Sequence, residues 1–138
     1  MVLVIDSPDT LCIIDTEASL VTVRSRVRAT AVQQGFGIVD QTKLVTAASE
    51  LARNVLRYAE RGRMVVEELS DGQRRGVRVT FEDDGPGIAN LDLALSDGYS
   101  TGDSLGIGLP GAKRLVDDLT IDSALGRGTT VVITTWLS

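Results

Sequence analysis

Histidine is absent from the 138-residue chain, and cysteine occurs once, as Cys12 in the apolar segment LCII. A single thiol cannot form a disulfide within one chain. A structural zinc site needs more histidine or cysteine ligands than this sequence contains. We therefore expect Cys12 to be a buried thiol in an apolar strand.

Long hydrophobic runs and an excess of positive charge are also missing. The opening MVLVIDSPD has a short apolar run without a basic segment, and it predicts neither a signal peptide nor a membrane span. The chain has 19 acidic and 14 basic residues, a net charge of −5 and a pI of about 4.7. Nucleic acids and anionic membranes attract basic proteins, so neither is an expected partner. We expect a single cytoplasmic domain over residues 1–138.

Hydrophobic periodicity predicts three helices. Apolar residues recur at intervals of three and four over about 17–34. They recur again in a second helix, which has its N-cap at Asp40 and a buried stripe from Leu44 to Val55, and ERGR at 60–63 breaks this pattern. A third helix is expected from about Pro110 to Asp118, because proline suits the first turn of a helix.

Strands are expected where β-branched and apolar residues cluster between turn signals. The segment ERGR at 60–63 separates the second helix from the strand predicted at 64–69. A polar, glycine-bearing loop over 84–104 separates the strand predicted at 76–83 from the third helix. The order predicts an α+β fold, a two-layer sandwich with helices on one face of a mixed, mostly antiparallel sheet. The predicted strands are 11–15, 64–69, 76–83, 119–125 and 128–137.

Residues 106–111 read GIGLPG, which has the G-x-G-x-x-G spacing of a dinucleotide-binding turn. That turn directly follows a buried strand in a β-α-β unit, whereas the polar segment DGYSTGDSL precedes this motif. The Walker pattern is absent. Gly106 and Gly108 instead predict backbone N–H groups near a helix N-terminus, where a phosphate can bind. A plain hinge is the alternative.

The segment ELARN places Glu50 and Asn54 four residues apart, on one helix face beside the apolar Leu51 and Val55. This position predicts that both side chains point into a cleft between helix and sheet. Carboxylate and amide oxygens are ligands that Mg²⁺ accepts. The alternative is an ordinary polar helix surface.

The segment EDDGPGI follows a predicted strand that ends at Asp83. Gly85 and Gly87 flank Pro86 and leave space beside the Asp83 carboxylate. A carboxylate in this position can accept a hydrogen bond from a flat base that carries an amino group. The alternative is an ordinary turn.

Together, E-x-x-x-N, D-x-G-x-G, G-x-G-L and a late Gly-Thr resemble the Bergerat ATP-binding fold (GHKL) shared by gyrase, Hsp90, histidine kinases and MutL. The resemblance runs from about residue 10 to the end, and it implies ATP and Mg²⁺ as cofactors. It implies that Asn54 binds Mg²⁺, that Glu50 is the general base and that Asp83 binds the adenine amino group. The other positions that it implies at the nucleotide are Arg57, Gly85, Gly87, Ile88, Gly106, Gly108, Leu109, Gly128 and Thr129.

In such proteins a lid closes over ATP, and here it would be about residues 91–105. The resemblance places Gly106 and Gly108 under the phosphates and the pair Gly128–Thr129 near the adenine floor. Arg57 corresponds to a basic residue that touches phosphate in histidine kinases, although a solvated arginine is the alternative. Related anti-sigma kinases carry an arginine in the lid, whereas this chain has no lysine or arginine between Asn90 and Gly111. Lys113, Arg57 or the metal would then contact the γ-phosphate.

The phrases GFGIVDQTKLVTAASELARN and DGYSTGDSLGIGLPGAKRLVD are similar to those of the RsbT-type serine/threonine switch kinases of the stressosome. That family phosphorylates STAS-domain scaffold proteins and then binds a PP2C-type phosphatase. With no histidine to phosphorylate, a sensor-kinase core is not expected. Two alternatives share the same pocket: an anti-sigma factor kinase, and a non-catalytic ATP-sensing protein-binding module.

Overall fold

The computed structural model describes residues 3–5, 11–86, 108–124 and 126–137. The predicted lid at 91–105 lies outside these residues, and so do Gly87, Ile88 and Gly106 of the predicted nucleotide site.

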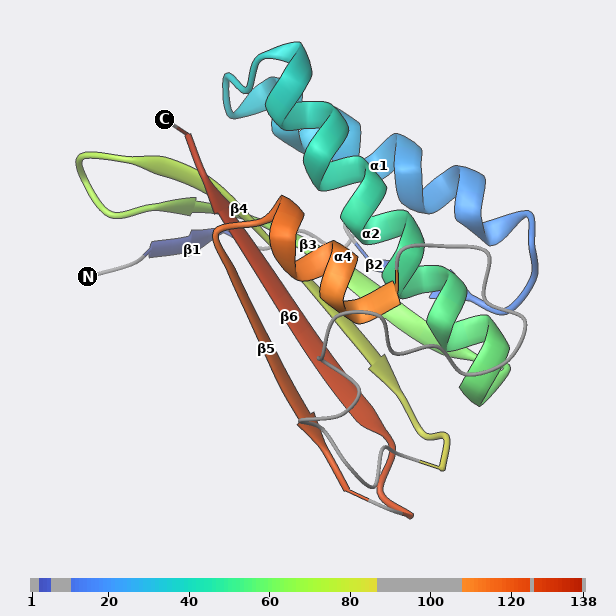
Figure 1. Ribbon diagram of the computed structural model, residues 1–138. Helices are drawn as coiled ribbons and strands as arrows, with labels where there is room; N and C mark the ends of the chain where they lie inside the picture. Colours follow the sequence, from blue (N-terminus) through green and yellow to red (C-terminus); the bar gives the residue numbers. More distant parts are fainter. Residues whose placement is uncertain (1–2, 6–10, 87–107, 125, 138) are drawn as a thin grey trace.

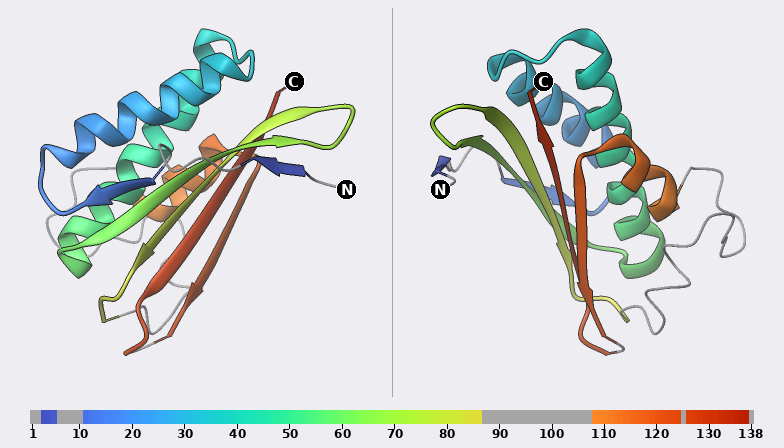
Figure 2. Two further views of the ribbon diagram at one scale, coloured as in Figure 1. Left: turned by 180° about the vertical axis from the view of Figure 1, so that it is seen from behind. Right: turned by 60° about the vertical axis from the view of Figure 1, so that its left-hand side comes forward.

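The described chain forms two layers, a twisted sheet and a layer of helices that covers one of its faces (Figure 1; Figure 2). Every pairing between the described strands is antiparallel. The strand order is β1-β3-β4-β6-β5, and β2 also pairs with β3. The α+β two-layer prediction is therefore confirmed. The strands are β1 (Leu3–Ile5), β2 (Leu11–Ile14), β3 (Gly62–Ser70), β4 (Arg75–Asp83), β5 (Asp118–Ser123) and β6 (Thr129–Trp136). The helices are α1 (Ser19–Gln33), α2 (Ile38–Ala59) and α4 (Gly108–Leu115).

The core lies between the two layers. Alternate residues of β4 and β6 point toward the helices, while α1 and α2 turn their apolar stripes toward the sheet. Cys12 is buried in this core, as expected. The fully buried side chains include Ile14, Val23, Val27, Leu44, Leu51, Met64, Val79, Phe81 and Ile133.

Strand β1 was not predicted. It pairs with the second half of β3, with Leu3 opposite Ser70, while β2 pairs with the first half, with Leu11 opposite Val65. A strand of three residues is too short for a periodic pattern to stand out.

The predicted start of the second helix at Asp40 is wrong. Gly37 is the N-cap, in an extended conformation, and α2 begins at Ile38. The side-chain amide of Gln41 donates a hydrogen bond to the carbonyl oxygen of Phe36 at 2.7 Å, which ties the first turn to the preceding loop. Asp40 lies in the first turn, where a negative charge interacts favourably with the helix dipole.

The predicted interruption at 60–63 ends too late. Glu60 has a φ of 69° and ends α2, but Gly62 already pairs with Asp83 as the first residue of β3. The register with β4, rather than side-chain periodicity, determines this start.

The third helix lies two to three residues earlier than predicted. Gly108 is its first residue, with a φ of +67°, and Pro110 is its third. The helix ends at Leu115. The Asp117 N–H then donates to the carbonyl of Thr134, and the Asp117 carboxylate accepts the N–H of Trp136 at 2.7 Å. These bonds commit the chain to β5 from Asp118 onward.

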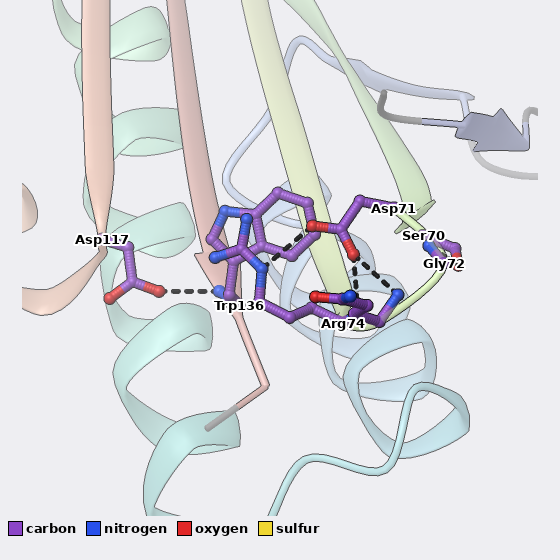
Figure 3. A network of polar contacts seen from close by, with 7 residues as sticks. Ser70, Asp71, Gly72, Arg74, Asp117 and Trp136 are labelled. Carbon is purple, nitrogen blue, oxygen red and sulfur yellow. Dashed lines mark hydrogen bonds and ion pairs between the residues drawn. The ribbon is translucent and has the colours of Figure 1, made fainter.

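The β3–β4 turn lies at the end of the sheet opposite Asp83, and a polar network closes it (Figure 3). The Asp71 carboxylate accepts hydrogen bonds from the backbone N–H groups of Gln73 and Arg74, at 3.0 and 2.7 Å, and from Nε of Arg74 at 3.0 Å. The Arg74 guanidinium lies over the ring of Trp136, 4.1 Å from its centroid. The network therefore joins the turn to the end of β6.

Candidate functional site

Asp83 is the last residue of β4, as predicted, and its carboxylate is half-buried. Its Oδ1 accepts the N–H of Gly85 at 2.9 Å, and the backbone of Thr129 also hydrogen-bonds to the carboxylate. Burial raises the pKa of Asp83 above its ordinary value of 3.8, and these two hydrogen bonds offset part of the rise. The carboxylate is thus fixed in orientation and only partly shielded from solvent.

Two glycines allow the backbone to come close to this carboxylate. A β-carbon on Gly85 would lie 2.6 Å from the Cβ of Ala59 on α2. A β-carbon on Gly128, which has a φ of +81°, would overlap the carbonyl oxygen of Asp83. Only glycine fits at either position. The structure therefore brings together Asp83, Gly85, Gly128 and Thr129, from two motifs far apart in the sequence.

Glu50 and Asn54 lie on helix α2, which packs against α1, α4 and β4. Glu50 is buried, with 12% of its side chain exposed, and Nη1 of Arg53 donates a hydrogen bond to its Oε1 at 2.8 Å. Asn54 is half-buried. The predicted general base is therefore held in an ion pair by a neighbour on the same helix.

A cavity of about 560 Å³ adjoins this ion pair and is lined, among the described residues, by Glu17, Arg53, Leu56 and Arg57. Its volume lies in the range of small-molecule sites. Two guanidinium groups and one carboxylate contribute charge to its wall. Arg57, which the sequence assigned to phosphate, is exposed and belongs to this wall.

Helix α4 begins at the predicted phosphate motif. Gly108 opens it, and Leu109 is partly buried against the core. Lys113, the other candidate for the γ-phosphate, is exposed in the last turn. The helix packs against α2. Gly108 and Leu109 therefore lie on the element next to the one that carries Glu50 and Asn54.

Sequence reasoning missed Arg53. The available signal was its spacing of three residues from Glu50, which places opposite charges side by side on a helix.

Comparison with known proteins decides the family. The family described as histidine kinase-, DNA gyrase B-, and HSP90-like ATPases matches residues 39–138. The serine/threonine-protein kinase RsbT of Bacillus subtilis (strain 168) is 42% identical over 130 residues, which cover 94% of this chain and 98% of RsbT. This chain belongs to the RsbT-type serine/threonine kinases of that ATPase family.

Solved structures agree with the RsbT-type fold. The chain superposes on the RsbU and RsbW domains of Rv1364c from Mycobacterium tuberculosis with a TM-score of 0.62 and 23% identity, covering 98% of this chain but 32% of that one. The mycobacterial sensor histidine kinase MprB gives a TM-score of 0.57 and 17% identity, covering 99% and 97% of the two chains. At these identities the likeness concerns the fold alone.

Family membership decides between the two ligands that the motif GIGLPG suggested, a dinucleotide and ATP. The motif belongs to an ATPase, so the RsbT-type kinase uses ATP, and the dinucleotide spelling is coincidental. Among the described helices of this kinase, none is both long and apolar enough to cross a membrane.

Proposed function

We propose that this kinase binds Mg·ATP between α2, α4 and the Asp83 end of the sheet, and phosphorylates a serine or threonine of a STAS-domain partner protein. The observation that carries the proposal is the half-buried Asp83 carboxylate, held by the backbone beside Gly85 and Gly128. Helix α2, which carries Glu50 and Asn54, packs against β4, which ends at Asp83, and this contact supports a base-binding site and a transfer site that share one nucleotide.

The Asp83 end fits an adenine. The Gly85 N–H donates a hydrogen bond to Oδ1 of Asp83. The carboxylate has further lone pairs that can accept a hydrogen bond from the exocyclic amino group of a base. Gly85 and Gly128 have no side chains to obstruct a flat ring. We propose that Thr129, together with Gly87 and Ile88 of the same motif, completes the walls of the adenine site.

The phosphates would lie toward the start of α4, where Gly106, Gly108 and Leu109 offer backbone N–H groups at the positive end of the helix dipole. Arg57 would add a positive charge from the cavity wall. When bound, Mg²⁺ would supply positive charge that offsets the charge of the phosphates. The described residues hold no cluster of three acidic, histidine or cysteine side chains. A single amide ligand, Asn54, fits a Mg²⁺ that keeps its waters and phosphate ligands.

The transfer step would use Glu50 as the proton acceptor. The partner's hydroxyl oxygen forms a bond to the γ-phosphorus, and the bond between that phosphorus and the β–γ bridging oxygen breaks. ADP leaves with the electron pair, and the hydroxyl proton passes to the Glu50 carboxylate. A carboxylate near cations is a weak base, so its share of the rate is about 10²-fold.

We also propose how the kinase acts in its pathway. After phosphorylation the STAS-domain protein would release the kinase, which would then bind a PP2C-type phosphatase, in a partner switch carried out in the cytoplasm. The 42% identity with RsbT supports this proposal. We propose that residues 1–138 act as a single domain. The support for this is that Ile14 and Val23 belong to the same hydrophobic core as Leu51 and Phe81.

The test is incubation of the purified chain with γ-labelled ATP, Mg²⁺ and a STAS-domain protein. We expect the label on a serine or threonine of the STAS protein, and none when that residue is replaced by alanine. Nucleotide-dependent binding of the STAS protein without any transfer would instead identify an ATP-sensing module. Capture of a sigma factor in a parallel pull-down would favour the anti-sigma kinase.

A further inference from the structure

The triphosphate end of the proposed site needs a cation that the lid does not supply. No lysine or arginine occurs between Asn90 and Gly111. Phosphoryl transfer depends on neutralising the charge that spreads over the γ-phosphate oxygens, commonly with an arginine or lysine. The cation must therefore come from elsewhere in the fold.

Arg53 has the position and the geometry for this role. It lines the 560 Å³ cavity next to Glu50, and its side chain is 34% exposed, so it contacts both the buried carboxylate and the open space. Its bond to Glu50 uses Nη1, which leaves other N–H groups of the guanidinium fork for a second acceptor. Arg57 lines the same cavity one turn further on.

Glu50 and a γ-phosphate would compete for the same guanidinium. In the structure, Nη1 of Arg53 lies 2.8 Å from Oε1 of Glu50. A phosphate carries more charge than a carboxylate and accepts an arginine fork with two parallel hydrogen bonds. A phosphate in the cavity would therefore draw Arg53 away from Glu50.

We propose that Arg53 is a positioning residue that recognises the γ-phosphate and releases Glu50. With ADP or without nucleotide, Arg53 pairs with Glu50 and keeps the carboxylate from the partner's hydroxyl. With ATP, Arg53 pairs with the γ-phosphate, and Glu50 becomes available to that hydroxyl. The inference rests on the proposed function, because it assumes the triphosphate lies against this part of α2.

The exchange of Arg53 between Glu50 and the γ-phosphate makes the general base available only when ATP, and not ADP, is bound. Glu50 is buried, and a buried carboxylate without a partner is unfavourable. Once the phosphate takes the guanidinium, the Glu50 carboxylate lacks a partner, and a substrate hydroxyl can supply the missing hydrogen bond. Discrimination between ATP and ADP and readiness for transfer then depend on one side chain.

The test measures the affinity of ADP and of a non-hydrolysable ATP analogue, each with Mg²⁺, by calorimetry. We expect R53Q to bind the analogue about 10- to 150-fold more weakly, the range for loss of a charge-assisted hydrogen bond, and to bind ADP within about twofold of the wild type. Lys43→Gln, an exposed residue of α2 far from the cavity, removes the same charge and should change neither affinity. R53K keeps a cation beside Glu50 and should lose only part of the discrimination.

A double-variant cycle separates the exchange from simple charge effects. E50Q removes the competitor, so it should tighten binding of the analogue relative to ADP, and this gain should shrink in E50Q/R53Q. Folded R53Q and R53K variants with wild-type discrimination between the two nucleotides would overturn the inference. If the wild type discriminates through Arg53 but phosphorylates no protein, the proposed function fails together with the release of Glu50 to a hydroxyl, and only recognition of the γ-phosphate by Arg53 stands. If the wild type phosphorylates its partner while R53Q discriminates normally, only the inference fails.

Discussion

Gly128 packs directly on the carbonyl oxygen of Asp83, so closely that a β-carbon at position 128 would overlap that oxygen. The contact joins the start of β6 to the end of β4, where Asp83 pairs with Thr129. It sets the position of the carboxylate that we propose to bind adenine.

Gly128→Ala should destabilise the protein and weaken nucleotide binding. The added methyl group must push β6 away from Asp83, and a φ of +81° is strained for alanine, so we expect a loss of about 2–4 kcal/mol in the free energy of unfolding. Gly72→Ala is the matched control, because Gly72 has a φ of +90° but open space around it. Urea titration of both variants would measure the difference. Equal losses would show that strain alone, and not the contact with Asp83, matters.

Asp83→Asn should weaken binding of ADP by about 10- to 150-fold, because the amide no longer offers a charged acceptor to the base. Calorimetry in the presence of Mg²⁺ would check this. Wild-type affinity in a folded variant would remove Asp83 from the adenine site.

Asp83→Asn should not lower the melting temperature at neutral pH, although it weakens nucleotide binding. Burial raises the pKa of Asp83 in the folded state above 3.8. The protonated carboxyl therefore stabilises the fold below pH 3.8, and this contribution to the free energy of unfolding is lost as the pH rises through the folded-state pKa. Without nucleotide, Asp83→Asn should therefore melt at or above the wild-type temperature at neutral pH. This advantage should shrink below pH 3.8. A variant that melts lower at neutral pH would contradict the direction of the shift.

Glu50→Gln and Asn54→Ala should fail in different ways. The glutamine cannot take up the hydroxyl proton, so the variant should lose about 10²-fold in transfer rate, while it binds ADP as the wild type does and binds the ATP analogue at least as tightly. Asn54→Ala removes a proposed Mg²⁺ ligand, so its nucleotide binding should lose its dependence on Mg²⁺. Binding titrations with and without Mg²⁺, combined with single-turnover transfer, would separate the two. A shared profile would contradict this division of roles.

Mg·ADP should protect the fold, and NAD should not. A ligand at 100 times its dissociation constant stabilises the folded state by about 2.7 kcal/mol, which raises the melting temperature. Thermal melts with Mg·ADP, with NAD and without ligand would test this prediction, and Asp83→Asn at the same Mg·ADP concentration should show a smaller rise. A rise with NAD alone would restore the dinucleotide interpretation of GIGLPG.

The turn at Asp71 should loosen in acid. Hydrogen bonds from the backbone N–H groups of Gln73 and Arg74, together with the Arg74 side chain, lower the pKa of Asp71 from 3.8 to about 2. A lowered pKa stabilises the fold above 3.8, and this contribution is lost as pH falls toward 2. Trp136 is the single tryptophan and lies under Arg74, so its fluorescence should change over that interval. Asp71→Asn should remove this change, whereas Asp118→Asn, at an exposed aspartate of β5, should leave it.

The sequence by itself determined the fold class, and it predicted the residues of the candidate site. Helical spacing in α2 revealed its buried stripe, because residues three and four apart share a face in any helix. The strand end at Asp83 was also readable, since a glycine- and proline-bearing turn follows it directly. Each of these signals lies within a few neighbouring residues.

The tertiary structure decided what local patterns do not contain. The start of β3 depends on pairing with β4, and the end of α4 depends on the bonds of Asp117 to β6, so periodicity misplaced both. The contact of Gly128 with Asp83 exists only because β4 and β6 adopt one register. Arg53 was readable as a helix neighbour of Glu50, but its position on a cavity wall with Arg57 and Glu17 depends on how α1 packs against α2. Turns and helix faces follow from bonds along a short stretch of chain, whereas shared walls and close backbone contacts require segments distant in sequence to pack together.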